Sequence, residues 1–452
     1  MIEFLHEFNN WLYAYILIVI LIGCGLFFTI RTKGVQFRLF GESCRLLFRS
    51  NDGVAEGKHI SNFQAFALAV ASRVGVGNIA GVAIAMTIGG PGSIFWMWIA
   101  AILGSATGFV EAVLAQLYKR EDKDSFIGGP AYYMEDGLGK RWMGIISAIM
   151  IILTFTVGFD SVQCNTLGLA FEKQFGWNHI IVGLIVTGLV ALVIIGGIQR
   201  VAKVASVLAP LMAVGYVLIA LLIIGMNLEK FPDVFRQIFS SAFALKSAGG
   251  GIAGAVVVQG VRRGLFSNEA GLGSIPNAAA TAHVSHPVKQ GLVQAMGVVV
   301  DTLLICSSTA FIILFSGVDL NGGITGIELA QFALRSQLGT FGSIFITVAM
   351  AFFVFTTLIT FYYYGEANLK FCTKKKWTVP VFKVFVLVCL MTGFCVSLDL
   401  VWEFTDTLMS FCGIFNLIAL LIMCPKVFSI TEDYISQKKA GIKDPVLKKW
   451  WN

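Results

Sequence analysis

Apolar residues recur along this chain in long runs, separated by short polar, basic or glycine-rich segments. Most runs are near or above the roughly 20 residues that an α-helix needs to cross the hydrocarbon core of a bilayer. We count eleven candidate spans, at residues 11–31, 62–89, 93–118, 142–168, 179–198, 202–227, 249–282, 290–317, 339–365, 377–398 and 400–424. The pattern predicts an all-α polytopic membrane protein with 11 transmembrane helices.

The composition agrees with this pattern, because 57% of the 452 residues are hydrophobic and only 13% are charged. A soluble domain carries about 25% charged residues, so a large soluble protein with buried helices is excluded. The net charge of +7 collects in loops, which fits membrane topology and gives no reason to expect nucleic acid as a partner. The nine cysteines form no CxxC pair and no hydrolase or nucleotide-binding motif occurs, so we expect neither a cofactor nor enzymatic activity.

Basic residues gather in alternate loops and therefore indicate an orientation. The first, third, fifth, seventh and ninth loops and the C-terminal tail hold most of the Lys and Arg residues. The second loop is only a GGPG turn, and in the fourth Lys173 stands beside Glu172. Since cytoplasmic loops carry an excess of basic residues, we expect a multi-pass protein of the plasma (inner) membrane with its N-terminus outside and its C-terminus in the cytoplasm.

Two of the predicted spans are interrupted by glycine and polar residues. The second span contains 74-VGVGNIAGV-82, and the seventh contains 249-GGGIAGAVVVQGVRRGLFSNEAGLGSIPN-277. They lie five spans apart, so equivalent elements in two halves of the chain would have opposite orientations. Broken helices in matching positions of inverted halves are typical of a transporter's midplane site, where freed N–H groups face an anion and freed carbonyls face a cation. Close helix packing through small residues is the competing explanation.

Six strings spread over most of the chain carry a family resemblance. They are 74-VGVGNIAGVA-83, 89-GGPGSIFWMW-98, 128-GGPAYYMEDGLG-139, 262-RRGLFSNEAGLGS-274, 286-HPVKQG-291 and 300-VDT-302. These strings closely resemble the alanine or glycine:cation symporter family. The resemblance implies sodium-coupled symport of small neutral amino acids, alanine and glycine, into the cell by alternating access. It also implies the inverted five-plus-five fold of the neurotransmitter:sodium symporters, with two discontinuous helices.

In that fold the chain divides into four parts. Residues 1–61 would form an extra N-terminal helix with its cytoplasmic loop, and residues 426–452 a cytoplasmic tail. The first repeat of five helices would take residues 62–227, and the second, inverted repeat residues 228–425.

The resemblance also implies roles for residues around the second span, which is similar to the unwound first core helix of neurotransmitter symporters. The N–H groups around Gly75, Val76 and Gly77 would hold the substrate carboxylate. The carbonyls of Ala71 and Val74 would ligate sodium, the coupling ion. The other candidates are Ser72, Gln163 and Gln259 for the substrate and Thr356 and Thr357 for sodium.

These assignments have alternatives on the sequence alone. The hydroxyls of Thr356 and Thr357 could bond back to their own helix, and Gln163 or Gln259 could form an interhelical hydrogen bond. A positive φ is a further expectation for one of the glycines in the break. Val76 departs from the family, in which threonine is common at this position, so a hydroxyl is missing while the backbone N–H remains.

Charged residues inside the spans allow further expectations. Arg73 either counters the substrate carboxylate or pairs with an intramembrane acid such as Glu111 or Asp301. We favour the pair, because a permanent cation in the site would oppose sodium. Arg262 and Arg263, together with Glu269, are expected to form a cytoplasmic gate or a positioning network, and Glu366 and Asp406 receive no role.

A channel and an intramembrane enzyme are the competing function classes. Two broken helices fit a closed midplane site better than a continuous pore, and no nucleophile–base pair or metal cluster is recognisable at depth. The expected partners are the amino acid, sodium and the lipid bilayer. The sequence leaves open alanine against glycine, D against L, sodium against proton, the number of ions and the oligomeric state, for which a monomer is expected.

Overall fold

The computed structural model describes residues 2–48, 60–122, 125–243 and 251–447, without the side chains of residues 251–253. Helices make up nearly all of this part of the chain, as the sequence predicts, apart from one two-stranded antiparallel hairpin. The start of the predicted span 249–282, residues 49–59 of the first loop and the last five residues of the tail lie outside the described residues.

The helices and strands in chain order are α1 (Ile2–Leu12), α2 (Ile18–Arg31), α3 (Val35–Arg38), α4 (Phe40–Phe48), α5 (Asn62–Arg73), α6 (Val82–Gly89), α7 (Ser93–Leu117), β1 (Arg120–Asp122), β2 (Ser125–Ile127), α8 (Pro130–Leu138), α9 (Arg141–Ile151), α10 (Asp160–Phe175), α11 (His179–Ile194), α12 (Gly197–Met226), α13 (Phe231–Ala242), α14 (Gly251–Asn268), α15 (Ile275–Ala279), α16 (Pro287–Val299), α17 (Ser307–Ser316), α18 (Gly326–Cys372), α19 (Thr378–Gly393) and α20 (Leu398–Lys439). Shorter helical segments are the π-helical η1 (Tyr13–Leu17), η2 (Gly77–Gly81), η3 (Ile152–Phe159) and η5 (Val300–Cys306), and the 3-10 helix η4 (Leu228–Lys230).

Each predicted span coincides with helix in the described residues, but not all of these helices are long and apolar enough to cross a membrane by themselves. Seven pass that test within the described residues, and an eighth does if the bent pair formed by α5 with η2 and α6 counts as one span. The apolar helices α11 and α19 have only 16 residues each. The count of eleven therefore stays a prediction, whereas a multi-pass membrane protein is established.

One predicted helix boundary agrees with the structure and another does not. The predicted span at 339–365 begins at Gly339, where a non-helical residue (φ 63°, ψ −151°) separates two helices inside α18. The predicted tail from residue 426 continues as helix, because α20 extends to Lys439. At 42 residues, α20 is about 60 Å long, roughly twice the hydrocarbon thickness, so part of it must lie outside the membrane core.

The second span is discontinuous where the sequence predicts. A capping box between Ser61 and Gln64 begins α5. The helix ends at Arg73 because Val74 adopts an extended conformation (φ −78°, ψ 98°). The helix that resumes at Gly77 is inclined by 53° to α5.

The seventh span is discontinuous as well. Helix α14 ends at Asn268, and α15 begins only at Ile275. Between them Glu269, Gly271 and Gly273 have φ values of 57°, 89° and 83°, a region that favours glycine. Non-helical backbone within a membrane span is tolerated only where it is buried in protein or lines a water-filled cavity.

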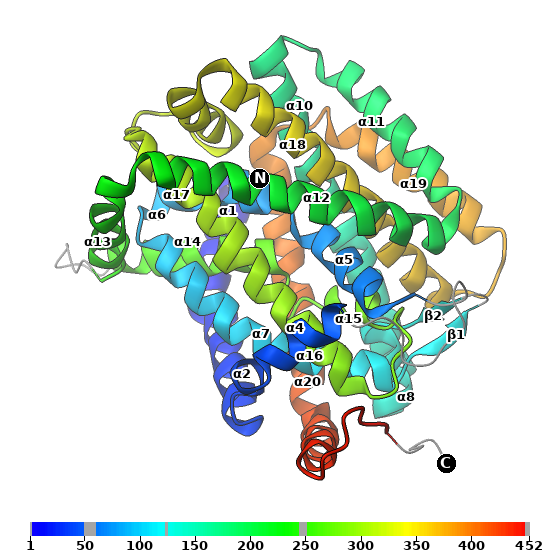
Figure 1. Cartoon of the computed structure of the whole chain (residues 1–452). Coiled ribbons are helices and arrows are strands. Elements are labelled where there is room, and N and C mark those ends of the chain that lie inside the picture. Colours follow the sequence, from blue (N-terminus) through cyan, green and yellow to red (C-terminus); the bar gives the residue numbers. More distant parts are fainter. Residues whose placement is uncertain (1, 49–59, 123–124, 244–250, 448–452) are drawn as a thin grey trace.

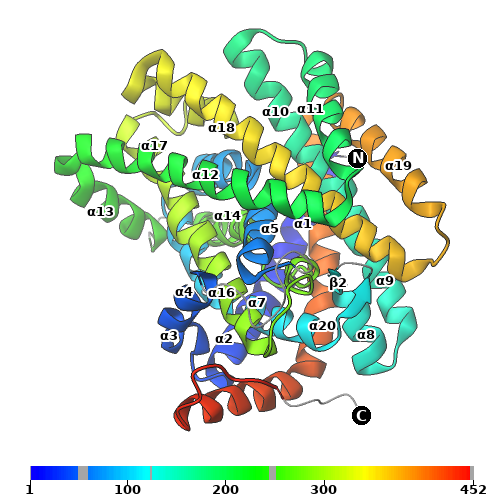
Figure 2. The same cartoon turned by 45° about the vertical axis from the view of Figure 1, so that its right-hand side comes forward.

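The two views of the fold show where the ends of the chain lie. The N-terminus is in the upper half of both pictures, and the C-terminal part of α20, in red, lies at the bottom beside the end of α2 (Figures 1 and 2). In Figure 2 the helices α5, α7, α14 and α16 lie near the middle of the bundle, and the residues of both breaks are buried.

Candidate functional site

The first break presents two backbone N–H groups to side-chain amides. The N–H of Val76 donates to Oε1 of Gln163 at 3.0 Å, and the N–H of Gly75 donates to Oδ1 of Asn78 at 2.9 Å. Both donors are buried. They are the groups that would hold a carboxylate, and the structure brings Gln163 directly to them from α10.

Three oxygens from the predicted sodium ligands converge beside this break. The hydroxyl of Thr357 donates to the carbonyl of Ala71 at 2.9 Å and lies 3.4 Å from that of Val74. It also lies 2.9 Å from the Phe353 carbonyl of its own helix. Thr356 is not part of the convergence, because its hydroxyl donates to the Phe353 carbonyl at 2.9 Å, which is the back-bonding alternative. The donor set is neutral oxygen, which fits a hard monovalent cation.

The glycines of the break are required by close approach, and the expected positive φ is wrong. Neither Gly75 nor Gly77 has a positive φ. A Cβ on Gly75 would lie 2.8 Å from Oε1 of Gln163, and one on Gly77 would lie 2.9 Å from Cδ1 of Phe266 and 3.1 Å from Cα of Ser267. The end of the Gln163 side chain could move away from a Cβ on Gly75, with loss of its hydrogen bond to Val76. The ring of Phe266 and the backbone of Ser267 leave less freedom at Gly77, so the steric requirement for glycine is stronger there.

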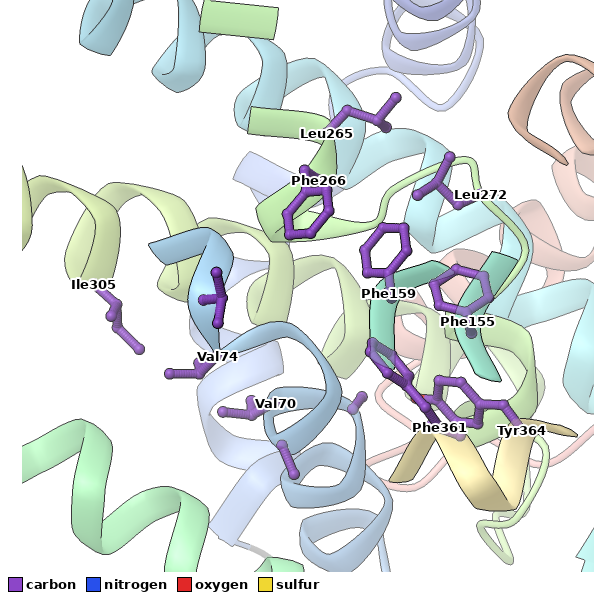
Figure 3. Packing of buried hydrophobic residues seen from close by; sticks show 14 of the residues in the cluster. Val70, Val74, Phe155, Phe159, Leu265, Phe266, Leu272, Ile305, Phe361 and Tyr364 are labelled. Atoms are coloured by element: carbon purple, nitrogen blue, oxygen red, sulfur yellow. The ribbon is translucent and has the colours of Figure 1, made fainter. Parts of the chain in front are cut away.

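Aromatic side chains cover the region between the two breaks. The rings of Phe159 and Phe266 stack with centroids 4.3 Å apart, and Trp402 lies 4.7 Å from Phe266. Phe361 meets Phe159 edge to face at 5.7 Å. Figure 3 shows Phe159, Phe266 and Phe361 of this cluster beside the turn at Val74. An amino-acid side chain seated at the break would therefore meet an apolar wall.

Ser72 links the first break to the second. Its hydroxyl donates to the Ala69 carbonyl at 2.9 Å and lies 3.4 Å from Oε2 of Glu269. Tyr364 of α18 donates to Ser72 at 3.1 Å. Ser72 therefore lies at the break, where the sequence places it, and connects three elements there.

The second break binds an internal carboxylate. Glu111 of α7 accepts from the N–H of Gly271 at 3.0 Å and from the N–H of Gly273 at 2.8 Å, and Asn416 donates to it at 2.7 Å. Successive N–H groups in such a turn form an anion-binding concavity. A side chain of the protein occupies this one.

A second buried carboxylate contacts the first break through the side chain of Asn78. Asp301 of η5 accepts from the Asn78 amide at 2.7 Å, from Ser267 at 2.7 Å and from Thr302 at 3.2 Å. Since Asn78 in turn accepts from Gly75, Asp301 orients the amide that holds the break.

Arg73 does not form the ion pair that the sequence predicts. Its Nη2 donates to Oε1 of Gln294 at 3.2 Å, while Nε and Nη1 have no hydrogen-bond partner among the described residues. Glu111, Glu269 and Asp301 are near enough to interact electrostatically with Arg73. Both oxygens of Glu111 and of Asp301, however, accept from other donors. Oε2 of Glu269 lies 3.4 Å from the Ser72 hydroxyl, and its Oε1 has no hydrogen-bond partner among the described residues. The arginine therefore balances three carboxyl groups at a distance.

Gln259 is predicted to contact the substrate, but the structure places it elsewhere. Its Cβ lies 3.1 Å from the position of a Cβ on Gly89, at the C-terminal end of α6. Gly89 is twelve residues beyond Gly77, about 18 Å along a helix. Helix α14 meets α6 at this end, so its glutamine cannot reach the break.

Arg262 and Arg263 have partners other than the predicted Glu269. Both bind Asp406 of α20, with nitrogen–oxygen distances of 2.6 Å and 2.7 Å, and Arg262 also lies 3.1 Å from Glu403. Two guanidinium groups and two carboxylates make the cluster neutral. Asp406 therefore joins α20 to α14, although the sequence analysis assigned no role to it.

The position of this cluster conflicts with the predicted topology or with the predicted gate. Arg262 donates to Asn10 at 3.3 Å and lies 4.9 Å above the ring of Tyr13, both near the N-terminus. The cluster therefore lies at the same end of the molecule as the N-terminus, so the predicted outside N-terminus and the predicted cytoplasmic gate cannot both hold.

Comparisons with known proteins identify the family of this chain. The family model described as "Sodium:alanine symporter family" matches residues 1–449. The chain belongs to the sodium:alanine symporter family. A probable sodium/glutamine symporter, GlnT, of Bacillus subtilis is 49% identical over 98% of this chain and 92% of its own length. The sodium/alanine symporter AgcS of Methanococcus maripaludis is 35% identical over 98% and 99%.

Solved structures show the same fold at low sequence identity. The structure of MhsT in complex with L-phenylalanine has a TM-score of 0.56 and 14% identity, covering 80% of this chain and 89% of that one. A manganese transporter of Eremococcus coleocola gives a TM-score of 0.54 at 14% identity, covering 82% and 80%. Membership of the sodium:alanine symporter family supports sodium-coupled amino-acid symport as the activity of this membrane protein.

Three residues of this site were missed by sequence reasoning or given another partner. Asn78 stands in the VGxGN string itself, and its amide type was the available signal. Asp406 is a lone carboxylate inside an apolar run, where a charged group is rare unless it has a function. Glu111 was considered only as a partner of Arg73, because nothing in the sequence shows that it meets the glycines of the seventh span.

Proposed function

We propose that this chain takes up small neutral amino acids, alanine and glycine, together with sodium across the plasma membrane. The observation that supports this most strongly is the meeting of Val76 N–H, the carbonyls of Ala71 and Val74, and the hydroxyl of Thr357 at one break. Donors for a carboxylate and acceptors for a cation thus lie within one short stretch.

In this proposal the substrate carboxylate takes the place of Oε1 of Gln163 at the N–H of Val76. The glutamine amide then turns to the bound amino acid. Sodium lies between the carbonyl oxygens of Ala71 and Val74 and the hydroxyl oxygen of Thr357. The hydroxyl keeps its proton and donates it to the Phe353 carbonyl, which already lies 2.9 Å away. The stacked pair Phe159 and Phe266 meets the substrate side chain, and their close packing favours a small one.

Alternating access in this proposal uses two inverted repeats, residues 62–227 and 228–425, with the N-terminus outside, the C-terminus in the cytoplasm and the monomer as the working unit. One sodium ion entering down about 100 mV gains about 2.3 kcal/mol. A roughly tenfold sodium gradient adds about 1.4 kcal/mol. Together they are enough for accumulation of a neutral solute by several hundredfold.

Glutamine is a second candidate substrate, because a relative that is 49% identical is named a probable sodium/glutamine symporter. It would need more space beside Phe266 than alanine does. The two candidates differ by the size of the side chain, so a direct competition separates them.

Counterflow in proteoliposomes tests the proposal. Vesicles loaded with unlabelled L-alanine, D-alanine, glycine, L-glutamine or no amino acid are diluted into labelled alanine, with sodium or with choline outside and at two external pH values. We expect labelled alanine to accumulate with alanine or glycine inside and sodium present. If labelled alanine accumulates only when glutamine is inside the vesicles, glutamine is the substrate in place of alanine and glycine. If it accumulates in choline at low external pH, a proton is the coupling ion in place of sodium.

A further inference from the structure

A basic groove lies at the end of the molecule opposite the N-terminus. It has a volume of about 530 Å³ and runs between the end of α2, α3 and the C-terminal part of α20. Its charged lining residues are Arg31, Lys33, Arg38 and Lys439, with Glu432 as the one acid. Four cations and one carboxylate leave a net charge of +3, so the groove attracts an anion.

The local backbone arranges these cations around the groove. Lys33 and Gly34 both have left-handed conformations (φ 55° and 63°), which turn the chain sharply after α2. Arg38 donates to the Lys33 carbonyl at 3.3 Å and closes this turn. On the facing helix Phe428 lies 5.1 Å from the guanidinium carbon of Arg31. The groove is therefore formed by a turn of defined conformation that packs against α20.

None of the four cations forms an ion pair with a carboxylate of the described residues. The nearby acid Glu42 instead pairs with Lys438 at 2.7 Å and with Arg45 at 4.0 Å. Positive charge thus collects in the groove without neutralisation from the surrounding described elements.

The groove adjoins the lipid-facing surface of α2. Arg31 ends an apolar helix long enough to cross a membrane. Just before it, Phe27 and Ile30 are 40% and 71% exposed. A charged groove at the end of a membrane span, next to exposed apolar side chains, lies at the depth of lipid head groups. Its ligand therefore combines an anionic head with an apolar tail.

We propose that this groove binds the phosphate group of an anionic phospholipid, with the acyl chains along Phe27 and Ile30. A soluble phosphate ester shares the same anionic chemistry but lacks the apolar part. By holding α2 and the C-terminal part of α20 together, the lipid stabilises the end of the bundle where both elements leave the membrane.

Thermal unfolding of the purified full-length protein in detergent tests this proposal. The midpoint is followed with increasing dioleoyl phosphatidylglycerol, dioleoyl phosphatidylcholine or inorganic phosphate. We expect phosphatidylglycerol alone to raise the midpoint, and Lys33→Gln/Arg38→Gln to need at least tenfold more of it. The matched control, Arg200→Gln/Lys203→Gln, removes one arginine and one lysine from exposed positions on α12 and should behave as the unmodified protein.

Each remaining outcome overturns the proposal. In the first, the groove variant and the unmodified protein need the same concentration of phosphatidylglycerol for the same rise in unfolding midpoint. In the second, the control variant needs as much additional phosphatidylglycerol as the groove variant. In the third, phosphatidylcholine raises the midpoint of the unmodified protein as much as phosphatidylglycerol does. Equal stabilisation by inorganic phosphate would assign the groove to a soluble anion. If the groove variant does not fold, raising the salt concentration must weaken the effect of phosphatidylglycerol on the unmodified protein, and a salt-independent effect contradicts ionic binding.

Discussion

Two neighbouring threonines on α18 differ in whether their hydroxyl groups can reach the proposed sodium site. Thr357 reaches the carbonyls of Ala71 and Val74, while Thr356, about 100° further around the helix, bonds only to its own backbone among the described contacts. The two side chains have the same chemistry, so they provide a matched pair for testing the proposed sodium site.

Replacing Thr357 with valine should raise the sodium concentration for half-maximal alanine uptake by about tenfold, since one oxygen ligand is lost while the shape is kept. Thr356→Val should leave the sodium dependence unchanged. The measurement is initial uptake in proteoliposomes over a sodium series. If both variants, or neither, shift the sodium dependence, the ion binds elsewhere.

At the scale of elements, α14 is held to α20 by a buried cluster of charges. Asp406 is fully buried and contacts both Arg262 and Arg263, whereas the Glu403 side chain is 14% exposed and contacts one of them. Removing one member of a buried ion pair leaves an uncompensated charge. The two carboxylates therefore differ in what their removal costs.

Asp406→Asn should lower the free energy of unfolding by about 3–5 kcal/mol, because two buried arginines lose their shared carboxylate. Glu403→Gln, which keeps Asp406 in place, should cost less than about 2 kcal/mol. Thermal unfolding of both purified variants without substrate provides the comparison. Equal losses would show that the cluster does not depend on the buried aspartate.

The sequence predicts the elements far better than their mutual contacts. Apolar runs and glycine clusters locate the helices and both breaks, because these depend on local composition. Arg73 and Arg262 do not have the predicted ion-pair partners, and Gln259 lies beside Gly89 and not at the first break, since each position depends on which helices meet in space. Asp406 lies more than 140 residues from its arginines, and no pattern within the chain connects them.

For the whole molecule, the C-terminal part of α20 connects to the start of α16 through His286. Its Nδ1 accepts from the N–H of Val288 at 3.2 Å, and its Nε2 lies 3.3 Å from Asp433. Burial lowers the pKa of His286 to about 4, despite the nearby Asp433. The ring is therefore neutral in the folded protein at neutral pH, and Nδ1 is free of a proton.

Stability should consequently fall as the pH falls from about 6.5 to about 4. An unfolded histidine binds a proton below about pH 6.5, and the folded one only near pH 4, so protons favour the unfolded chain in between. The loss should reach at most about 3 kcal/mol. Thermal unfolding across this range should show it, and His286→Asn, which keeps a cap acceptor, should flatten the profile by that amount. Identical profiles would exclude His286 as the cause.

The Glu111 carboxylate at the second break has a consequence for stoichiometry. The two breaks occupy corresponding places in the chain, yet the N–H groups of Gly271 and Gly273 are already bonded to a residue that can never dissociate. An anion that is covalently part of the protein cannot be exchanged between the two sides of a membrane. In the proposed arrangement of two inverted repeats, this tethered anion fills the second of two corresponding positions, and we expect each transport cycle to carry a single amino acid.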